Sequence, residues 1–462
     1  MTTTRTTAPQ ASVGLLTDRY ELTMLASFIR EGIVDKPAVF ECFARRLPAG
    51  RRYGMLAGLG RLLPLIEDFR FDAAEVRWLE EEAVIDAATA SYLRDFHFSG
   101  DVTGLREGDL YFPGTPVLTV EATLGEGVLL ETLVLSVLNH DTAIASAAAR
   151  MVTAAADRPL IEMGSRRTHE ASAIAVARAA YIAGFASTSN LAAGYLYAVP
   201  TVGTAAHAFT LAHESEMDAF RSQVTTHGAG TTLLVDTYDT QQGIRNAVAA
   251  TREVHPDANG PGAVRLDSGD LAEEARAARA LLDSLGATDT RITVTSDLDE
   301  YVITALADAP IDGYGAGTRV ATGSGHPTAG MVYKLVSIEG RDGEMRPVAK
   351  KASGKGSVGG RKTVWRTFDD HGTMAREIHA VDNVAVHAET GEETMHVAQL
   401  PLMRDGRTVH APPLTTVRTH AAGSLARLPL VAHDVSDGEP VIVPTTVLPT
   451  RTPAAATALQ EA

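Results

Sequence analysis

Arginine and aspartate stand two residues apart in the segment VRLDSGD, residues 264–270. Side chains alternate along a strand, so Arg265 and Asp267 point to one face and Val264 and Leu266 to the other. A carboxylate beside a guanidinium can hold the hydroxyls of a sugar while the guanidinium holds an anion. A buried structural ion pair at the strand end is the alternative interpretation. Spacing alone leaves both open.

A glycine-rich run, GYGAGT, covers residues 313–318. Gly315 and Gly317 leave backbone N–H groups unobstructed and Thr318 adds a hydroxyl, a combination that can cradle a phosphate. A plain tight turn is the competing interpretation. The run lacks the Lys-Ser/Thr ending of a P-loop, so it does not predict a nucleotide loop of that kind.

Paired arginines open a predicted helix in the segment GSRRTHE, residues 164–170. Arg166 and Arg167 stand where the helix dipole adds to their attraction for an anion. A solvated pair facing Glu170 is the plainer alternative. Lys355, in the run ASGKGSVGGRK, is a further anion contact to consider, although no strand–loop–helix context supports a Walker site there.

Histidine 207 lies in the segment VGTAAHAF, shortly after Thr204. A histidine at a strand end can be a general base, a nucleophile or a satisfied core residue. The six-residue spacing to His213 does not suit a helical zinc pair, and neither HExxH nor CxxC occurs. Near the start, Asp18 and Tyr20 suggest no more than a helix N-cap and an amphipathic aromatic.

Strand-then-helix units must position these side chains. From residue 129 short apolar runs alternate with Ala-rich helical segments, a pattern typical of parallel strands with helical crossovers. About seven units occupy some 200 residues, as a β/α barrel requires. Because barrel sites form at the carboxyl ends of the strands, the polar clusters there should converge; they comprise residues 164–167, 187–190, 204–207, 236–239, 265–270, 296–297 and 315–319.

The sequence pattern differs on either side of this central region. Residues 13–130 mix helical segments with short Gly- and Pro-punctuated strands, which indicates an α+β unit. After residue 335 strands and turns follow with no further βα pattern, and we expect this part to extend the first domain. The ends, 1–12 and 450–462, have no periodic pattern and are expected to be flexible tails.

Length and composition agree with a folded protein of two or three domains. The chain has 462 residues, 45% hydrophobic and 21% charged, and a net charge of −16. The acidity argues against nucleic-acid and membrane partners and requires a local basic pocket for any anionic ligand. Cys42 is the single cysteine, which fits a cytoplasmic location. Neither a secretory signal nor a membrane span is expected.

Ten segments in order resemble nicotinate phosphoribosyltransferases, most closely the actinobacterial type: TDRYELTM, FECFARRLP, EMGSRRTHEA, GFASTSN, VGTAAHAF, LLVDTYDT, VRLDSGDL, TSDLDEY, GYGAGT and MVYKLV. The resemblance runs from about residue 15 to residue 366. It implies an α/β fold of the type II phosphoribosyltransferases, an irregular β/α barrel packed on an α/β sandwich domain. The expected parts are 13–130 and 336–449 for the sandwich and 131–335 for the barrel with the active site.

The resemblance also implies a reaction. These enzymes transfer the phosphoribosyl group of 5-phosphoribosyl 1-diphosphate to the ring nitrogen of nicotinate, which yields nicotinate mononucleotide for NAD synthesis and releases diphosphate. ATP hydrolysis is coupled to the transfer through a phosphorylated histidine. Mg²⁺ is expected on the diphosphate. A homodimer with shared active sites is expected as well.

Residue by residue, the resemblance assigns His207 as the phosphorylated histidine and Asp267 as the carboxylate on the ribose hydroxyls. Arg265 and Thr204 match residues that contact nicotinate, and Tyr20 matches an aromatic supplied by the partner subunit that stacks on the pyridine. The remaining matches are to phosphate and diphosphate contacts: Gly315, Gly317, Thr318 and Arg166, with Arg45 and Lys355 reached across the dimer.

Asn190 stands where related nicotinamide-using enzymes have an aspartate. An aspartate accepts from a carboxamide but repels a carboxylate, whereas Asn190 can donate, so this position favours the acid over the amide. Two positions depart from the family pattern: Met163 replaces a second stacking aromatic, and Gly359 replaces a proline near Lys355. Nicotinamide or quinolinate phosphoribosyltransferase and a non-catalytic nucleotide-binding homologue are the alternatives.

Overall fold

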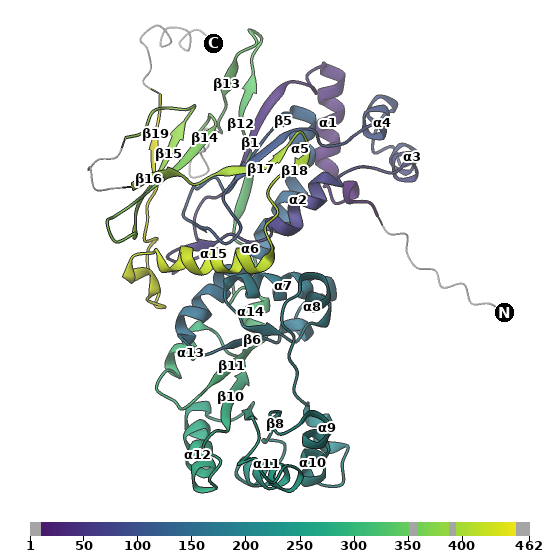
Figure 1. The fold of residues 1–462 in the computed structure, drawn as a ribbon. Coiled ribbons are helices and arrows are strands. Elements are labelled where there is room, and N and C mark those ends of the chain that lie inside the picture. Colours follow the sequence, from purple (N-terminus) through teal and green to yellow (C-terminus); the bar gives the residue numbers. More distant parts are fainter. Residues whose placement is uncertain (1–10, 351–357, 388–393, 450–462) are drawn as a thin grey trace, which may run out of the picture. The chain divides into compact units, whose positions relative to one another are not determined.

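The computed structural model describes residues 11–350, 358–387 and 394–449, which form two compact units (Figure 1). Unit 1 takes the chain up to Thr142, then Thr328–Ala432 and the residues from Asp437 onward. Unit 2 consists of Ala143–Pro327 and His433–Ser436. The chain therefore leaves unit 1, builds unit 2, and returns.

The first boundary lies inside one long helix, α6 (Glu131–Ala155), later than the expected position after residue 130. Leu133, Val137 and Leu138 on its first turns are buried in the core of unit 1, which explains why this part of the helix belongs there. The second boundary precedes residue 335 because β12 (Met331–Glu339) pairs with β1 (Pro37–Ala44) of unit 1.

Unit 1 is built on a seven-stranded sheet in the order β13-β12-β1-β5-β3-β17-β18 and a four-stranded sheet in the order β16-β14-β15-β19. The remaining strands of the larger sheet are β3 (Asp101–Gly104), β5 (Leu118–Thr123), β13 (Met345–Pro347), β17 (Leu400–Arg404) and β18 (Arg407–Thr408). The smaller sheet has β14 (Lys362–Phe368), β15 (Met374–Val381), β16 (Thr394–Val397) and β19 (Thr445–Val447), and β2 (Gly54–Met55) pairs with β4 (Leu110–Tyr111).

Helices pack on these sheets and bury an apolar core in which Phe40 and Tyr333 stack at a 5.1 Å centroid distance. The helices of unit 1 are η1 (Val13–Leu15), α1 (Arg19–Glu31), α2 (Leu59–Glu67), α3 (Ala73–Glu81), α4 (Ala87–Arg94), α5 (Leu124–Leu129) and α15 (Leu414–Ala426), with η3 (Leu430–His433) at a unit boundary. Asp18 precedes α1 as its N-cap residue, but its side chain makes no capping hydrogen bond. The sequence did not predict α15, which buries only Val417 and Ala421.

Unit 2 contains one parallel sheet of six strands in the order β7-β6-β11-β10-β9-β8. The strands are β6 (Leu160–Glu162), β7 (Ser187–Thr188), β8 (Thr232–Leu234), β9 (Ala263–Leu266), β10 (Arg291–Ser296) and β11 (Gly313–Ala316). The order is cyclic, since the last strand in the chain, β11, pairs with the first, β6. This is the order of a β/α barrel that is open between β7 and β8, so the predicted α/β fold class is confirmed.

Helices follow the strands of unit 2, as the alternating pattern predicted: η2 (Gly164–Arg166), α7 (Glu170–Ala183), α8 (Leu191–Tyr197), α9 (His207–Leu211), α10 (Glu216–His227), α11 (Thr240–Val254), α12 (Leu271–Ser284), α13 (Glu300–Ala305) and α14 (Thr318–Ala321). Acidic side chains cap three of them. Asp239, Asp270 and Asp299 accept hydrogen bonds from the first N–H groups of α11, α12 and α13. These aspartates at the strand ends thus have a structural task.

The opening of the barrel lies at residues 200–207, PTVGTAAH, one of the about seven segments expected to form strand-then-helix units. This segment contributes a single bridge, between Thr201 and Thr188, instead of a strand. Pro200 has no N–H for a ladder, and both Val202 and Gly203 are exposed. Within the described residues, no helix has the length and apolar character needed to cross a membrane.

Candidate active site

The guanidinium of Arg265 lies at the carboxyl end of β9. Its Nη1 donates to Thr204 Oγ1 and, at 3.4 Å, to the Ala205 carbonyl, and its Nη2 is 4.0 Å from Asp267 Oδ2. The buried Nε has no hydrogen-bond partner within the described structure. The side chain is 14% exposed, so the spare hydrogen-bonding capacity of Arg265 faces a nearly closed site rather than bulk water.

Asp267 follows β9 and is held by neighbours on both sides. Thr295, on β10, donates its hydroxyl to Asp267 Oδ1, and the Asp267 N–H donates to Asp236 Oδ2 at 2.9 Å. Asp236, after β8, also accepts from Ser268 Oγ at 2.8 Å, while its buried Oδ1 has no partner in the described residues. Two carboxylates with unfilled acceptor capacity therefore lie beside Arg265.

His207 begins α9, on the segment that crosses the opening of the barrel. Its Nδ1 lies 3.1 Å from Thr237 Oγ1, and Thr237 directly follows Asp236. A chain of contacts, through Thr237, therefore connects His207 with Asp236, Asp267, Arg265 and Thr204, which lie up to 63 positions apart in sequence.

The glycine-rich run after β11 packs closely against the loop after β6. The Met163 N–H donates to the Ala316 carbonyl at 2.8 Å. A Cβ on Gly315 would come within 2.6 Å of Thr295 Cγ2 and 2.9 Å of Met163 Sδ. Gly317 directly precedes α14, which Thr318 begins. Space restricts position 315 to glycine, and the same packing sets Gly315 beside Thr295, the partner of Asp267.

Asn190 caps α8 at the end of β7. Its Oδ1 accepts from the Ala193 N–H at 2.9 Å, and its Nδ2 donates to Ser165 Oγ at 3.0 Å. The cap fixes the orientation of the amide, so the donor group is turned away from the helix. Ser165 belongs to the loop that also carries Arg166. The structure thus brings Asn190 to the same end of the sheet as Met163.

Glu162, the last residue of β6, lies in the segment EMGSRR but is not among the predicted site residues. It is 1% exposed and accepts from Thr188 Oγ1 at 2.5 Å and from the Gly164 N–H. Burial raises the pKa of this carboxyl, and the two hydrogen bonds offset only part of that effect. The sequence signal was an acidic residue at the end of an apolar strand. Such residues are seldom fully buried, so a buried one points to a specific role.

Positive charge gathers at the same end of the sheet. Burial is the main cause that lowers the pKa of Arg265; Asp267 and Asp236 oppose it, and Arg166 adds to it by repulsion. That repulsion means that two guanidinium groups share one neighbourhood. Arg166 is exposed on η2. Paired cations of this kind favour an anionic ligand.

Two predicted residues lie in unit 1, and a third lies outside the described residues. Tyr20, on α1, is 45% exposed and belongs to unit 1, where burial and Glu131 raise its pKa to about 12. Arg45 follows β1 in unit 1, and its buried Nε has no described partner. Lys355 lies outside the described residues, and Gly359 packs against the backbone of Val348.

A cavity of about 410 Å³ lies beside the segment that contains Thr204. It is lined by residues of that segment, of α10 and of the loop before β8: Gly203, Thr204, Ala205, Phe209, Ser222, Gln223, Thr226, His227, Gly230 and Thr231. It occupies the opening of the barrel between β7 and β8. Neither Asp267 nor Arg265 lines it, but Thr204 and Ala205, which both accept from Arg265, do.

Over the described ranges, no group of three or more histidine, cysteine, aspartate or glutamate side chains could hold a metal ion. The carboxylates of Asp236 and Asp267 offer oxygen atoms, one of them unpartnered, which is the ligand type that Mg²⁺ prefers. They suit a magnesium ion that arrives with a phosphate ligand better than a resident metal.

Comparisons with solved structures place the fold. Human nicotinic acid phosphoribosyltransferase superposes with a TM-score of 0.76 at 24% identity, covering 93% of this chain and 97% of that chain. Nicotinate-nucleotide pyrophosphorylase from Pyrococcus furiosus gives a TM-score of 0.73 at 22% identity, covering 92% and 99%. The fold is therefore that of the phosphoribosyltransferases with an incomplete β/α barrel.

Sequence comparison is more specific. The nicotinate phosphoribosyltransferase (NAPRTase) N-terminal domain family matches residues 15–139. Nicotinate phosphoribosyltransferase pncB1 of Mycobacterium tuberculosis is 53% identical over 449 residues, 95% of this chain and 96% of the relative. The Bacillus subtilis enzyme of the same name is 41% identical over 364 residues, 78% of this chain and 74% of the relative. The chain belongs to the nicotinate phosphoribosyltransferase family.

Proposed function

We propose that this protein transfers the phosphoribosyl group of 5-phosphoribosyl 1-diphosphate to nicotinate, with nicotinate mononucleotide and diphosphate as products. The reaction would serve NAD synthesis from nicotinate. The observation that carries the proposal is the contact chain from His207 to Thr204 through Asp236, Asp267 and Arg265, in a chain 53% identical to a named relative. The cytoplasmic location expected from sequence is part of the same proposal.

The transfer forms a bond between the pyridine nitrogen and C1 of the ribose while the bond from C1 to the diphosphate oxygen breaks. The nitrogen lone pair makes the new bond, and the diphosphate leaves with the old bonding pair. Asp267 holds the ribose hydroxyls through the oxygen that Thr295 does not occupy. Arg265, with its Nε unused, and Thr204 hold the nicotinate carboxylate.

The 5′-phosphate is assigned to the glycine-rich run after β11. Gly315 and Gly317 have no side chain to cover their backbone N–H groups, and Thr318 adds a hydroxyl. Arg166 supplies the positive charge for the diphosphate that leaves. Mg²⁺, when bound with the substrate, would neutralise part of the diphosphate charge, and Asp236 and Asp267 are the residues suited to meet it.

His207 is the residue that couples ATP to this transfer. Its Nδ1 contact with Thr237 orients the ring. A phosphoryl group on the imidazole would place negative charge beside Asp236 and Arg265, and this charge would shift the affinities for substrates and products. ATP is thus a co-substrate, converted to ADP and phosphate.

A homodimer completes the site in this proposal. Tyr20 is 45% exposed at the start of α1, as an aromatic that stacks on a ligand of a second subunit requires. Arg45 and Lys355 would be the cationic contacts from that subunit. The test is a mixture of Tyr20→Ala and Asp267→Asn proteins, in which mixed dimers regain one intact site and hence activity that neither parent has.

The deciding experiment incubates the purified protein with 5-phosphoribosyl 1-diphosphate and ATP and offers nicotinate, nicotinamide or quinolinate. We expect nicotinate mononucleotide and ADP with nicotinate only. Product from nicotinamide or quinolinate instead would reassign the substrate. No product from any of the three would favour a nucleotide-binding homologue.

The histidine assignment has its own test. His207→Ala should abolish ATP-coupled turnover and labelling from γ-labelled ATP. His213, whose Nδ1 lies 2.8 Å from the Phe209 carbonyl, provides the matched control, since His213→Ala should leave labelling intact. Labelling that persists in His207→Ala and disappears in His213→Ala would transfer the role.

A further inference from the structure

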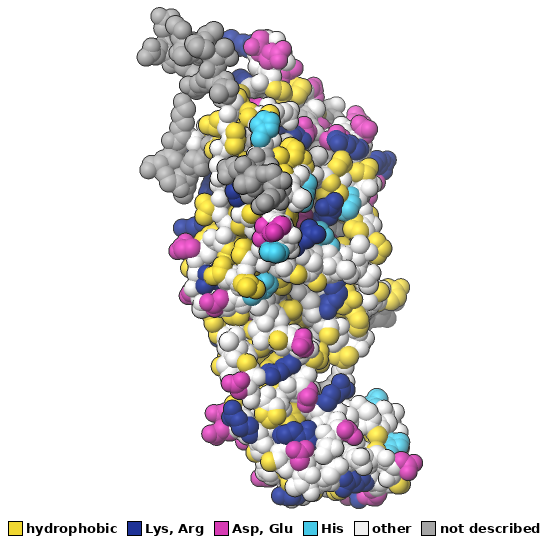
Figure 2. Space-filling view, turned by 60° about the vertical axis from the view of Figure 1, so that its left-hand side comes forward, with side chains coloured by type: hydrophobic (Ala, Val, Ile, Leu, Met, Phe, Trp, Pro, Cys, Tyr) yellow, Lys and Arg dark blue, Asp and Glu magenta, His cyan; other side chains and the backbone are white. Residues whose placement is uncertain are grey.

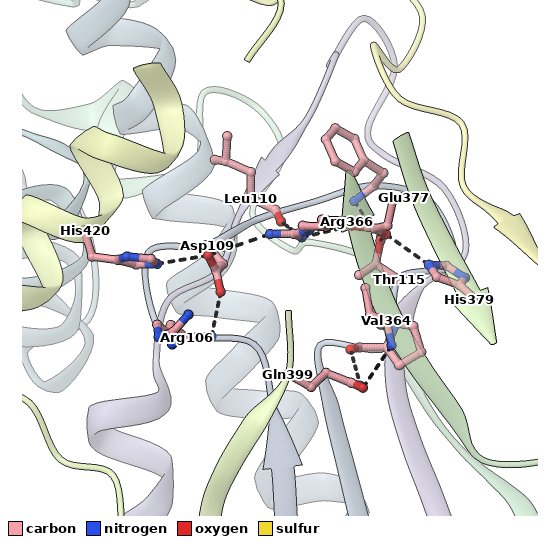
Figure 3. Close-up of polar contacts among 12 residues, drawn as sticks. Arg106, Asp109, Leu110, Thr115, Val364, Arg366, Glu377, His379, Gln399 and His420 are labelled. Atoms are coloured by element: carbon pink, nitrogen blue, oxygen red, sulfur yellow. Dashed lines mark hydrogen bonds and ion pairs between the residues drawn. The ribbon is translucent and has the colours of Figure 1, made fainter. Parts of the chain in front are cut away.

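A line of alternating charges crosses the interior of unit 1 (Figure 3). His420 Nε2 lies 2.9 Å from Asp109 Oδ1, and Asp109 is 3.7 Å from Arg366 Nη1. Arg366 donates to Glu377 at 2.9 Å, and Glu377 in turn lies 3.0 Å from His379 Nε2. Asp109, Arg366, Glu377 and His379 are buried. Each acid in this line is matched by a cation or an imidazole.

A cavity of about 200 Å³ opens at one end of this line, between β14, β16 and α15. Its lining includes three arginines, Arg106, Arg366 and Arg427, but only one acid, Asp109. Asp109 is already engaged by His420 and Arg366. Within the described residues, neither Arg106 nor Arg427 forms an ion pair with a carboxylate, so the cavity carries uncompensated positive charge.

The pKa of a neighbouring histidine reflects the same positive charge. Burial, followed by Arg427, Arg366 and Arg106, lowers the pKa of His396, which lines the cavity. His396 stacks on Phe368 at 4.9 Å, and the guanidinium of Arg427 lies 5.3 Å from the centre of the Phe368 ring. These contacts position Arg427 and His396 before a ligand binds, whereas Arg106 is exposed at the cavity rim. Figure 2 shows histidine side chains among Lys and Arg side chains on a face of unit 1.

Such a concentration of arginine is unusual in a protein with a net charge of −16. The acidic remainder of the surface repels anions, so an anion that binds here must gain direct hydrogen bonds. Planar guanidinium groups are suited to oxyanions of phosphate type, with which they form paired, charge-assisted hydrogen bonds.

We propose that this cavity of unit 1 is a second binding site, separate from the barrel, for a small phosphate-type oxyanion held by Arg106 and Arg427, with Arg366, whose own hydrogen bonds go to Glu377 and the Leu110 carbonyl, in the cavity wall. Inorganic phosphate, diphosphate and the phosphate end of a nucleotide share the required chemistry. Asp109 positions Arg366 and does not contact the anion.

Gly423 provides a test without removing any arginine. It lies on α15 at the cavity wall, and a Cβ added there meets no atom within 4 Å. Gly423→Glu places a carboxylate among the arginines, and Gly423→Gln adds the same bulk without charge. Isothermal titration with inorganic phosphate should show a binding component that Gly423→Glu weakens by at least about tenfold and Gly423→Gln preserves. Equal affinity in both variants would overturn the proposal.

Arginine variants provide the second measurement. Arg106→Gln with Arg427→Gln should remove the same component, whereas Arg341→Gln with Arg346→Gln, the same loss of charge at exposed positions of unit 1, should retain it. Because Arg166 is proposed to bind phosphate groups in the barrel, the component must persist in Arg166→Gln. Its disappearance there would mean that the signal belongs to the barrel.

Three ligands identify the source of the oxyanion. Phosphate, diphosphate and AMP are titrated in parallel, with acetate as a singly charged control. Tighter binding of one phosphate ligand than of acetate, abolished by Gly423→Glu, supports the site and ranks its ligands. Equal binding of all four, insensitive to Gly423→Glu, means charge screening only and refutes it.

Discussion

Two arginines of this protein, the buried Arg366 in unit 1 and the half-buried Arg265 in unit 2, have opposite surroundings. Arg366 donates to Glu377 and to the Leu110 carbonyl and also faces Asp109. Arg265 donates to Thr204 and the Ala205 carbonyl, stands 4.0 Å from Asp267, and keeps its Nε unpaired. Arg366 has carboxylate partners at hydrogen-bond distance, whereas Arg265 has none.

Two buried glutamates repeat the contrast. Burial alone would raise the pKa of Glu377, yet Arg366 and His379 outweigh it and lower that pKa. Glu162 has only a hydroxyl and an N–H as partners, so burial prevails and its pKa is raised. Charges that stabilise a fold are matched within it, whereas charges at a site await a ligand. Burial alone does not separate these roles; the remaining hydrogen-bonding capacity does.

Removal of Arg366 should give the largest effect on stability. Arg366→Met leaves Glu377 and Asp109 buried without their cation, and breaking a buried pair in this way costs about 3–5 kcal/mol of unfolding free energy. Urea unfolding measures this loss. In the fraction that remains folded, kcat/KM should change little, because no residue of this network is among those proposed to contact the substrates.

A double variant sharpens that prediction. Arg366→Met combined with Glu377→Gln removes one of the orphaned charges and should recover part of the loss, so the two changes are not additive. Full additivity would mean that the ion pair contributes nothing and that Arg366 acts only through its packing.

Removal of Arg265 should reverse the pattern. Arg265→Gln should lower kcat/KM for nicotinate by about 100-fold, through loss of a charged contact to the substrate, with little change in unfolding free energy. Arg221, an exposed arginine of the same unit that pairs with Asp218 and Glu253, is the control. Arg221→Gln should alter neither quantity by much. A large loss of stability in Arg265→Gln would make Arg265 a second Arg366.

Asn190 tests the contrast at a neutral side chain. Asn190→Asp keeps an oxygen that caps α8, but its charge repels the nicotinate carboxylate, so kcat/KM for nicotinate should fall about tenfold while stability is unchanged. Asn190→Ser also keeps a cap and lacks the charge, so its loss should be smaller. Unchanged nicotinate kinetics in Asn190→Asp would remove this residue from substrate recognition.

The barrel strands were predictable because their chemistry is local. Segments VRLDSGD and RITVTSD combine a buried apolar run with polar ends, and β9 and β10 lie where they predict. The same locality explains Asp267 beside Arg265. The prediction of a strand in PTVGTAAH was wrong, since Pro200 and Gly203 limit the pairing of this segment to one bridge.

The polar line of unit 1 could not be predicted in the same way. Asp109 and Arg366 come from strand and loop segments that are distant along the chain, and nothing in either local sequence names the other. Long-range register decides such pairs. Likewise, α15 has a weak apolar pattern, so its place against the rest of unit 1 depends on tertiary contacts.

The smallest effects, and the most direct measure of the contrast, come from the pH dependence of stability in Glu377→Gln and Glu162→Gln. The folded pKa of Glu377 is lowered below 4.5, so its contribution is present above pH 4.5 and is lost as pH falls through the folded value. The folded pKa of Glu162 is raised above 4.5, so its contribution is complete below pH 4.5 and is lost as pH rises through the folded value. Unfolding in urea from acid to neutral pH should therefore show Glu377→Gln losing stability relative to the parent toward neutral pH, and Glu162→Gln gaining it. Curves that shift in the same direction would mean that the two glutamates share one electrostatic role. The distinction between charges paired within the fold and charges left to bind a ligand would then fail.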